Sequence, residues 1–178
     1  MKTIYSNICD ILDYKPIYKT KEGKYAVVVE KVFVEDKLQS SKTKLQKDKK
    51  PAGIYSFNYM IFDGKPTTAE IKAAYEDYIN SLVENRIVND FVYEGNHVNL
   101  SKENQINYKS AYDLAMQTTG ANLPYKIRCK LNGKPQYLVF ENTIDFTKFY
   151  VAMSKHIQNC LEDGWNKKDT MDYSIYVQ

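Results

Sequence analysis

One stretch of the chain alternates strictly between apolar and charged side chains. It runs from Tyr125 to Leu131, and its two sets are Tyr125, Ile127, Cys129 and Leu131, and Lys126, Arg128 and Lys130. Because successive side chains of a strand point to opposite faces, this pattern predicts a strand with one buried and one solvated face. Asn132-Gly133 follows, a pair typical of type I′ turns, so residues 136–140 should return antiparallel. The chain must therefore contain a small antiparallel sheet.

Two segments before this hairpin have helical periodicity. The first follows Thr67, which together with Glu70 has the spacing of a capping box, and it continues to about Glu84. The second begins after Ser101, a residue type that caps helix N-termini, and Gly120 is expected to end it. Between the two helices, Glu94-Gly95-Asn96 predicts the turn of a second, shorter hairpin.

A third helix is expected after the hairpin, from about Thr143 to Asp163. Gly164 would end this helix, since glycine readily adopts the left-handed conformation found at helix C-termini. Trp165 would then fold back onto the last turn.

The first third of the chain is predicted to be β-structure. Tyr25 to Val34 is rich in β-branched residues and should pair with residues 16–20, and Ile54 to Phe62 forms a further strand. The fold class is therefore α+β. Residues 1–65 form a β-rich segment with a lysine-rich loop at 36–50, and residues 66–178 form a three-helix domain with a small antiparallel sheet of hairpins.

Composition argues against several functions. The chain has 25 basic and 22 acidic side chains and a net charge of +3, which is too balanced for a nucleic-acid-binding protein judged by its overall charge. No apolar run is long enough for a transmembrane helix, and the N-terminus lacks the apolar segment of a signal peptide. We expect synthesis in a cytoplasm and neither membrane nor nucleic acid as a partner.

The residues that carry most enzyme chemistry are few and scattered. There is no nucleophile elbow, phosphate-binding loop or dinucleotide fingerprint. His97 is expected on the surface of a hairpin and His156 as a hydrogen-bonded structural residue of a helix. Cys9, Cys129 and Cys160 are too far apart for a zinc motif, and the last two should be buried thiols. We therefore expect no catalytic, cofactor-binding or metal-binding residues and no small-molecule substrate.

Tyrosine is unusually abundant, with 16 Tyr against 7 Phe and 1 Trp. Tyrosines suit protein interfaces, but they also fill half-buried faces of strands and helices, and both interpretations stay open. On the first interpretation the candidate partner-binding residues are Lys42, Lys44, Lys47, Tyr55, Phe57, Tyr59, Tyr173 and Tyr176. The lysines would act as a docking segment or belong to a solvated loop.

Several sequence blocks after Pro66 occur in a distinctive order. They are Tyr78-Ile79-Asn80-Ser81-Leu82, Phe91-Val92-Tyr93-Glu94-Gly95, Val98-Asn99-Leu100-Ser101-Lys102-Glu103-Asn104-Gln105, Asn107-Tyr108-Lys109-Ser110-Ala111-Tyr112-Asp113-Leu114-Ala115, Leu123-Pro124, Asp145-Phe146-Thr147-Lys148-Phe149-Tyr150 and Gly164-Trp165-Asn166-Lys167-Lys168-Asp169. In these blocks the chain resembles a domain family of unknown biochemical function, found in phages and prophages of gut bacteria and often encoded near tail-fibre and baseplate genes.

The resemblance implies a role in phage morphogenesis or virion structure without enzymatic activity. We expect a tail, fibre or capsid-associated component of the virion, made in the bacterial host cytoplasm, whose partners are other phage structural proteins or further copies of itself. One alternative is a tail-fibre assembly chaperone that is absent from the mature particle. Others are a small phage hydrolase and a nucleic-acid-binding accessory protein that uses the lysines of 36–50.

Overall fold

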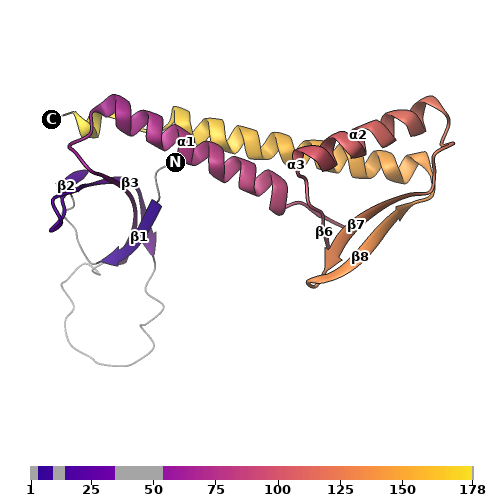
Figure 1. The fold of residues 1–178 in the computed structure, drawn as a ribbon, viewed down its shortest axis with the longest axis horizontal. Helices are drawn as coiled ribbons and strands as arrows, with labels where there is room; N and C mark the ends of the chain where they lie inside the picture. Colours follow the sequence, from indigo (N-terminus) through magenta and orange to yellow (C-terminus); the bar gives the residue numbers. More distant parts are fainter. Residues whose placement is uncertain (1–3, 10–14, 35–53, 178) are drawn as a thin grey trace, which may run out of the picture. The chain divides into compact units, whose positions relative to one another are not determined.

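The computed structural model describes residues 4–9, 15–34 and 54–177. Within them the chain forms three α-helices and two four-stranded antiparallel sheets, which confirms the α+β class (Figure 1). The chain divides into two compact units: residues 1–78 with 171–178, called here the first unit, and residues 79–170, the second unit. The predicted lysine-rich loop at 36–50 lies outside the described residues.

The sheet of the first unit has the strand order β1-β4-β3-β2, with β1 at Ile4–Cys9, β2 at Ile17–Lys19, β3 at Tyr25–Val34 and β4 at Ile54–Phe62. The predicted pairing of β2 with β3 is confirmed, as is the strand β4. The strand β1, which pairs with β4, was not predicted.

An irregularity in β3 is held by the C-terminal end of the chain. The register of β3 against β4 shifts between Val28 and Glu30, which is the mark of a β-bulge. Tyr176, in the short 3-10 helix η1 (Ser174–Tyr176), is buried, and its hydroxyl donates a hydrogen bond to the carbonyl of Val28. Tyr173 packs edge-on against Tyr75, and its buried hydroxyl has no hydrogen-bond partner among the described residues.

These two tyrosines form a matched pair for a stability test. We expect Tyr176→Phe to destabilise the protein by about 1–2 kcal/mol, because the buried Val28 carbonyl loses its partner. Tyr173→Phe should leave stability unchanged or raise it, since its hydroxyl is already desolvated without a partner. Thermal unfolding followed by circular dichroism measures both. Equal losses in the two variants would contradict the bond assigned to Tyr176.

The second unit contains the later part of α1 (Thr68–Asn89), α2 (Lys102–Gln117), α3 (Thr143–Asp169) and a sheet of order β5-β6-β7-β8. Its strands are β5 (Val92–Tyr93), β6 (Asn96–His97), β7 (Tyr125–Leu131) and β8 (Lys134–Phe140). Figure 1 shows α2 and α3 side by side on one face of the β7–β8 hairpin. Both predicted turns are confirmed: Glu94-Gly95 and Asn132-Gly133 have positive φ at both residues, as type I′ requires.

The predicted N-terminal caps of the first two helices are present. Thr67 Oγ1 accepts a hydrogen bond from the Glu70 amide, and a carboxylate oxygen of Glu70 accepts one from the Thr67 amide, which completes a capping box. At the start of α2, the Ser101 hydroxyl oxygen accepts a hydrogen bond from the amide of Asn104. The helix α1 continues to Asn89, past its predicted end.

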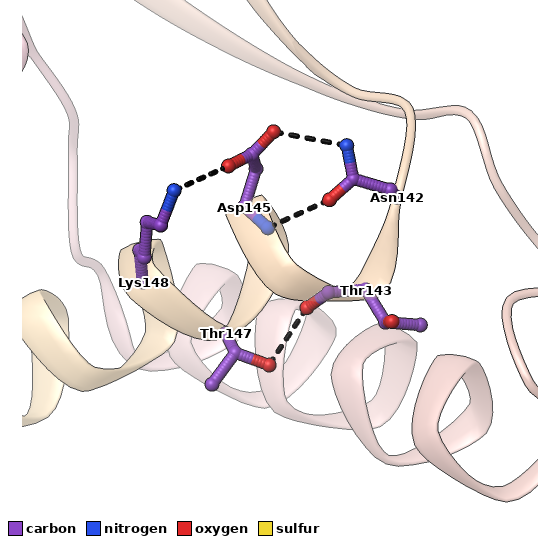
Figure 2. A network of polar contacts seen from close by, with 5 residues as sticks. All are labelled: Asn142, Thr143, Asp145, Thr147 and Lys148. Atoms are coloured by element: carbon purple, nitrogen blue, oxygen red, sulfur yellow. Dashed lines mark hydrogen bonds and ion pairs between the residues drawn. The ribbon is translucent and has the colours of Figure 1, made fainter.

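The N-terminus of α3 carries a connected set of polar contacts (Figure 2). The Asn142 side-chain oxygen accepts from the Asp145 amide at 2.9 Å, and the Asp145 carboxylate accepts from Asn142 and, at 2.8 Å, from Lys148. Hydrogen bonds from Lys148 and Asn142 hold the pKa of Asp145 below its usual value. The Thr147 hydroxyl donates to the Thr143 carbonyl one turn earlier. Ionised Asp145 therefore stabilises the positive end of the helix dipole.

The predicted end of α3 is wrong. The helix passes through Gly164 and continues to Asp169, while Trp165 points outward with half of its surface exposed. Gly164 is buried, and a Cβ atom added there would lie 2.4 Å from Cγ2 of Val83 on α1. The glycine serves close packing of two helices instead of ending one.

We expect Gly164→Ala to destabilise the protein by about 1 kcal/mol, although alanine is the better helix former. The stiff, β-branched Val83 cannot move aside by rotating, so the added methyl group forces the helices apart. The double variant Gly164→Ala/Val83→Ala should lose less unfolding free energy than the sum of the losses in the two single variants. Urea unfolding measures all three. Ser154→Ala, at an exposed position of α3, is the control. A Gly164→Ala protein more stable than the parent would show that this contact does not constrain the helices.

Candidate functional site

The residues predicted to bind a partner do not form one exposed surface. Lys42, Lys44 and Lys47 lie outside the described residues, as does the side chain of Tyr55. Phe57 and Tyr176 are buried and belong to the core of the first unit. Tyr59 and Tyr173 are half-buried. The described tyrosines that are exposed are Tyr18 and Tyr137, neither of which was singled out.

Both histidines lie where the sequence placed them. His97 is exposed on β6. Nε2 of His156 lies 3.2 Å from the carbonyl oxygen of Arg86, and because a carbonyl only accepts, that nitrogen carries the hydrogen. The Cys160 sulfur is 3.8 Å from the same nitrogen. Protonated Nε2 cannot take a proton from this thiol, so the pair lacks the arrangement of a nucleophile and its base.

The thiols of Cys129 and Cys160 are buried, as predicted. Burial raises the pKa of both thiols, which keeps them in the unreactive protonated form at neutral pH. Among the described residues, no group of three or more His, Cys, Asp and Glu side chains is arranged to hold a metal ion. No described helix has the length and apolar character needed to cross a membrane.

In a Cys9→Ser background, the two remaining thiols should react with a disulfide reagent at least about a hundredfold more slowly in the folded protein than in denaturant. The reason is that both sulfurs are covered and protonated. Absorbance of the released thiolate measures the rate, and the protein unfolded in guanidinium provides the control. Fast reaction in the folded state would mean that one of the thiols is open to reagents.

A groove of about 830 Å³ lies in the second unit, between β7 and the N-terminal half of α2. Its lining includes Lys126, Arg128 and Lys130 from β7, His97 from β6, and Asn107 and Tyr108 from α2.

The groove exists because β7 is longer than its neighbour on that side. The strand β6 has two residues, and it pairs with β7 at one position, His97 with Lys130. The chain then turns away from β7, and the Leu100 amide donates to the carbonyl of Val88 at 2.9 Å. The part of β7 before Lys130 consequently has no strand beside it on this edge among the described residues.

The turn at Asn132-Gly133 determines which main-chain groups point to this open edge. A two-residue type I′ turn makes its flanking residues, here Leu131 and Lys134, a hydrogen-bonded pair, and such pairs alternate along the hairpin. Pro135, which has no N–H, accordingly lies opposite Lys130 at a position that needs no bond to β7. By the same alternation, the N–H and C=O groups of Lys126 and Arg128 point toward the groove.

The charged side chains of this surface are all positive. The residues from Tyr125 to Phe140 include four cations and no carboxylate, and the groove lining contains no Asp or Glu. Several lysines elsewhere in the unit form ion pairs, for example Lys102 with Glu84 and Lys148 with Asp145. The side chains of Lys126, Arg128 and Lys130 form no ion pair or hydrogen bond with any described residue. On the exposed face of the sheet they lie beside Tyr137 and Val139.

The hydroxyl of a buried tyrosine also belongs to the groove. Tyr108 is 6% exposed, and its ring packs edge-on against Phe149 at 5.7 Å. Burial raises the pKa of Tyr108 to about 12, so its hydroxyl remains a hydrogen-bond donor at neutral pH. No described residue makes a hydrogen bond with it. The groove thus offers main-chain groups, cations and one neutral donor to a bound molecule.

Comparison of the chain with protein-family models, curated proteins and solved structures gives no match. The interpretation of the groove therefore rests on its own chemistry. Sequence analysis recognised the alternation of β7 but treated its cations as an ordinary solvated face. The signal that could have pointed further was the run from Tyr125 to Phe140, in which cations are not balanced by any carboxylate.

Proposed function

We propose that this chain is a non-enzymatic protein that acts through protein–protein contacts, as a structural component of a phage particle. The observation that supports a role in protein–protein contacts is the open, cationic edge of β7. An unpaired strand edge binds other polypeptide chains through its main-chain groups, and proteins normally keep such edges short or covered. Here the edge is left accessible along Lys126 to Cys129, beside an exposed aromatic ring, Tyr137.

The phage assignment is supported by the resemblance of residues 66–178 to a domain family of phage structural gene clusters. A particle component needs contact surfaces on a stable fold more than a reaction centre. The side chains here that are reactive in many enzymes have structural positions instead. His156 is bonded to a carbonyl, and Cys129 and Cys160 are enclosed.

A second candidate, binding of single-stranded nucleic acid, is favoured by one specific observation. Lys126, Arg128 and Lys130 lie on the same sheet face as the exposed ring of Tyr137, and cations beside aromatic rings are the components of such sites. The surface is small, and the chain as a whole is close to neutral. We therefore rank this function below protein binding.

The test uses particles purified from a host that carries the gene. We expect quantitative mass spectrometry to find this protein at a fixed ratio to the major structural proteins. The double variant Lys126→Gln/Arg128→Gln should be incorporated at about a tenth of the parental level or less, because the contacting cations are lost. Lys155→Gln, at an exposed position of α3, should be incorporated normally. Abundance in infected cells with absence from particles would replace the structural role by that of an assembly chaperone.

A further inference from the structure

We infer that the groove receives an acidic, extended segment of a partner protein, which pairs with the open edge of β7 as an additional strand. This inference rests on the proposed protein-binding function and specifies the chemistry of the partner. Three features of the groove lead to it: the direction of the main-chain groups, the charge of the adjacent side chains and the unpartnered hydroxyl of Tyr108.

The main-chain groups come first because they define the shape of the ligand. The amides and carbonyls of Lys126 and Arg128 repeat every second residue along the edge. This is the spacing at which a neighbouring strand forms its hydrogen bonds, so the ligand that fits is an extended chain. The turn of the chain after His97 leaves room for a strand in the position that a longer β6 would occupy. Beside Lys126 and Arg128, where the sheet consists of β7 and β8 alone, binding would add a third strand.

The side chains define the charge of the ligand. In an added strand, every second side chain would lie on the exposed face of the sheet beside Lys126 and Arg128, where opposite charges across strands attract. These cations have no described partner, and the groove lining holds no carboxylate that would compete. Asp or Glu at alternate positions would neutralise them. A partner segment with a basic or apolar pattern would leave them uncompensated.

The other side chains of the added strand would point to the face covered by the helices, toward Tyr108 and Asn107 of α2. The Tyr108 hydroxyl is a neutral donor at the groove that lacks a described partner, so a ligand that brings an acceptor within reach would gain a hydrogen bond there. The expected pattern of the segment is therefore acidic residues that alternate with small or β-branched ones.

A second copy of this chain is a poorer occupant. Two β7 edges brought together would place Lys126 and Arg128 of one copy beside the same cations of the other, and like charges across strands repel. An acidic segment avoids this repulsion. Binding of an acidic segment can be tested on the full-length protein with a peptide of defined sequence.

The probe is a fluorescently labelled peptide, Asp-Val-Glu-Val-Asp-Val-Glu. The first control replaces its acids with Lys. The second carries a methyl group on every main-chain amide nitrogen, which keeps the charge but removes the main-chain donors that a strand needs. Anisotropy should detect binding of the first peptide alone. Lys126→Gln/Arg128→Gln should weaken it about tenfold or more, while Lys134→Gln, at the tip of the same hairpin, should have no effect.

Amide hydrogen exchange measured by NMR provides the readout that is specific for strand pairing. In the free protein, the amides of Lys126 and Arg128 should exchange faster than those of Ile127 and Cys129, which face β8. The peptide should slow exchange at Lys126 and Arg128 by about tenfold or more and leave the neighbouring amides as they were. Binding of the methylated peptide with equal affinity, or binding without this protection, would overturn the inference. Preference for a single-stranded oligonucleotide over the acidic peptide would also overturn it.

The two proposals fail separately. If the protein is a particle component but the peptide does not bind, the strand-pairing inference is wrong and the structural role remains. If the peptide binds with the expected protection while the protein is absent from particles, the groove is a strand-binding site that works outside the virion.

Discussion

The ring of Phe149 lies next to aromatic rings from several parts of the second unit. It is fully buried on α3, and its centre lies 5.1 to 5.8 Å from the rings of Phe91, Tyr93, Tyr108 and Phe140. These four residues come from the segment after α1, from β5, from α2 and from β8. Because large aromatic side chains dominate the apolar area that folding buries, this cluster holds the helices to the sheet. It also fixes Tyr108, and with it the wall of the groove that α2 provides.

Features of the fold that depend on neighbouring residues could be predicted from the sequence. The capping box at Thr67 and the turn at Asn132-Gly133 are decided by hydrogen bonds and φ angles within a few residues, so their patterns were sufficient. Gly164 was misinterpreted because its role depends on Val83, which is distant in the sequence. A glycine that ends a helix and one that admits a second helix look the same in a single sequence.

The candidate site was hidden from sequence analysis for a related reason. The abundant tyrosines left a binding surface open as one interpretation, but most described tyrosines are half-buried or buried; Tyr112 and Tyr150, for example, are half-buried and stack at 4.3 Å. The open edge of β7 depends on where β6 stops and on the bond from Leu100 to Val88, and neither has a local signature. Alternation predicted that β7 has two faces. It could not predict that one side of the strand would lack a neighbour.

An accessible strand edge is also a hazard, since it can recruit copies of its own chain into aggregates. In this protein the cations along β7 oppose such self-association, because two β7 edges that approach each other bring like charges together. That protection is electrostatic and therefore has a range, about 8 Å at physiological ionic strength, and it weakens as salt is added. Colloidal stability of the purified protein is thus tied to the composition of its buffer. An acidic partner would neutralise these charges, but it would also cover the edge, so the repulsion would no longer be needed.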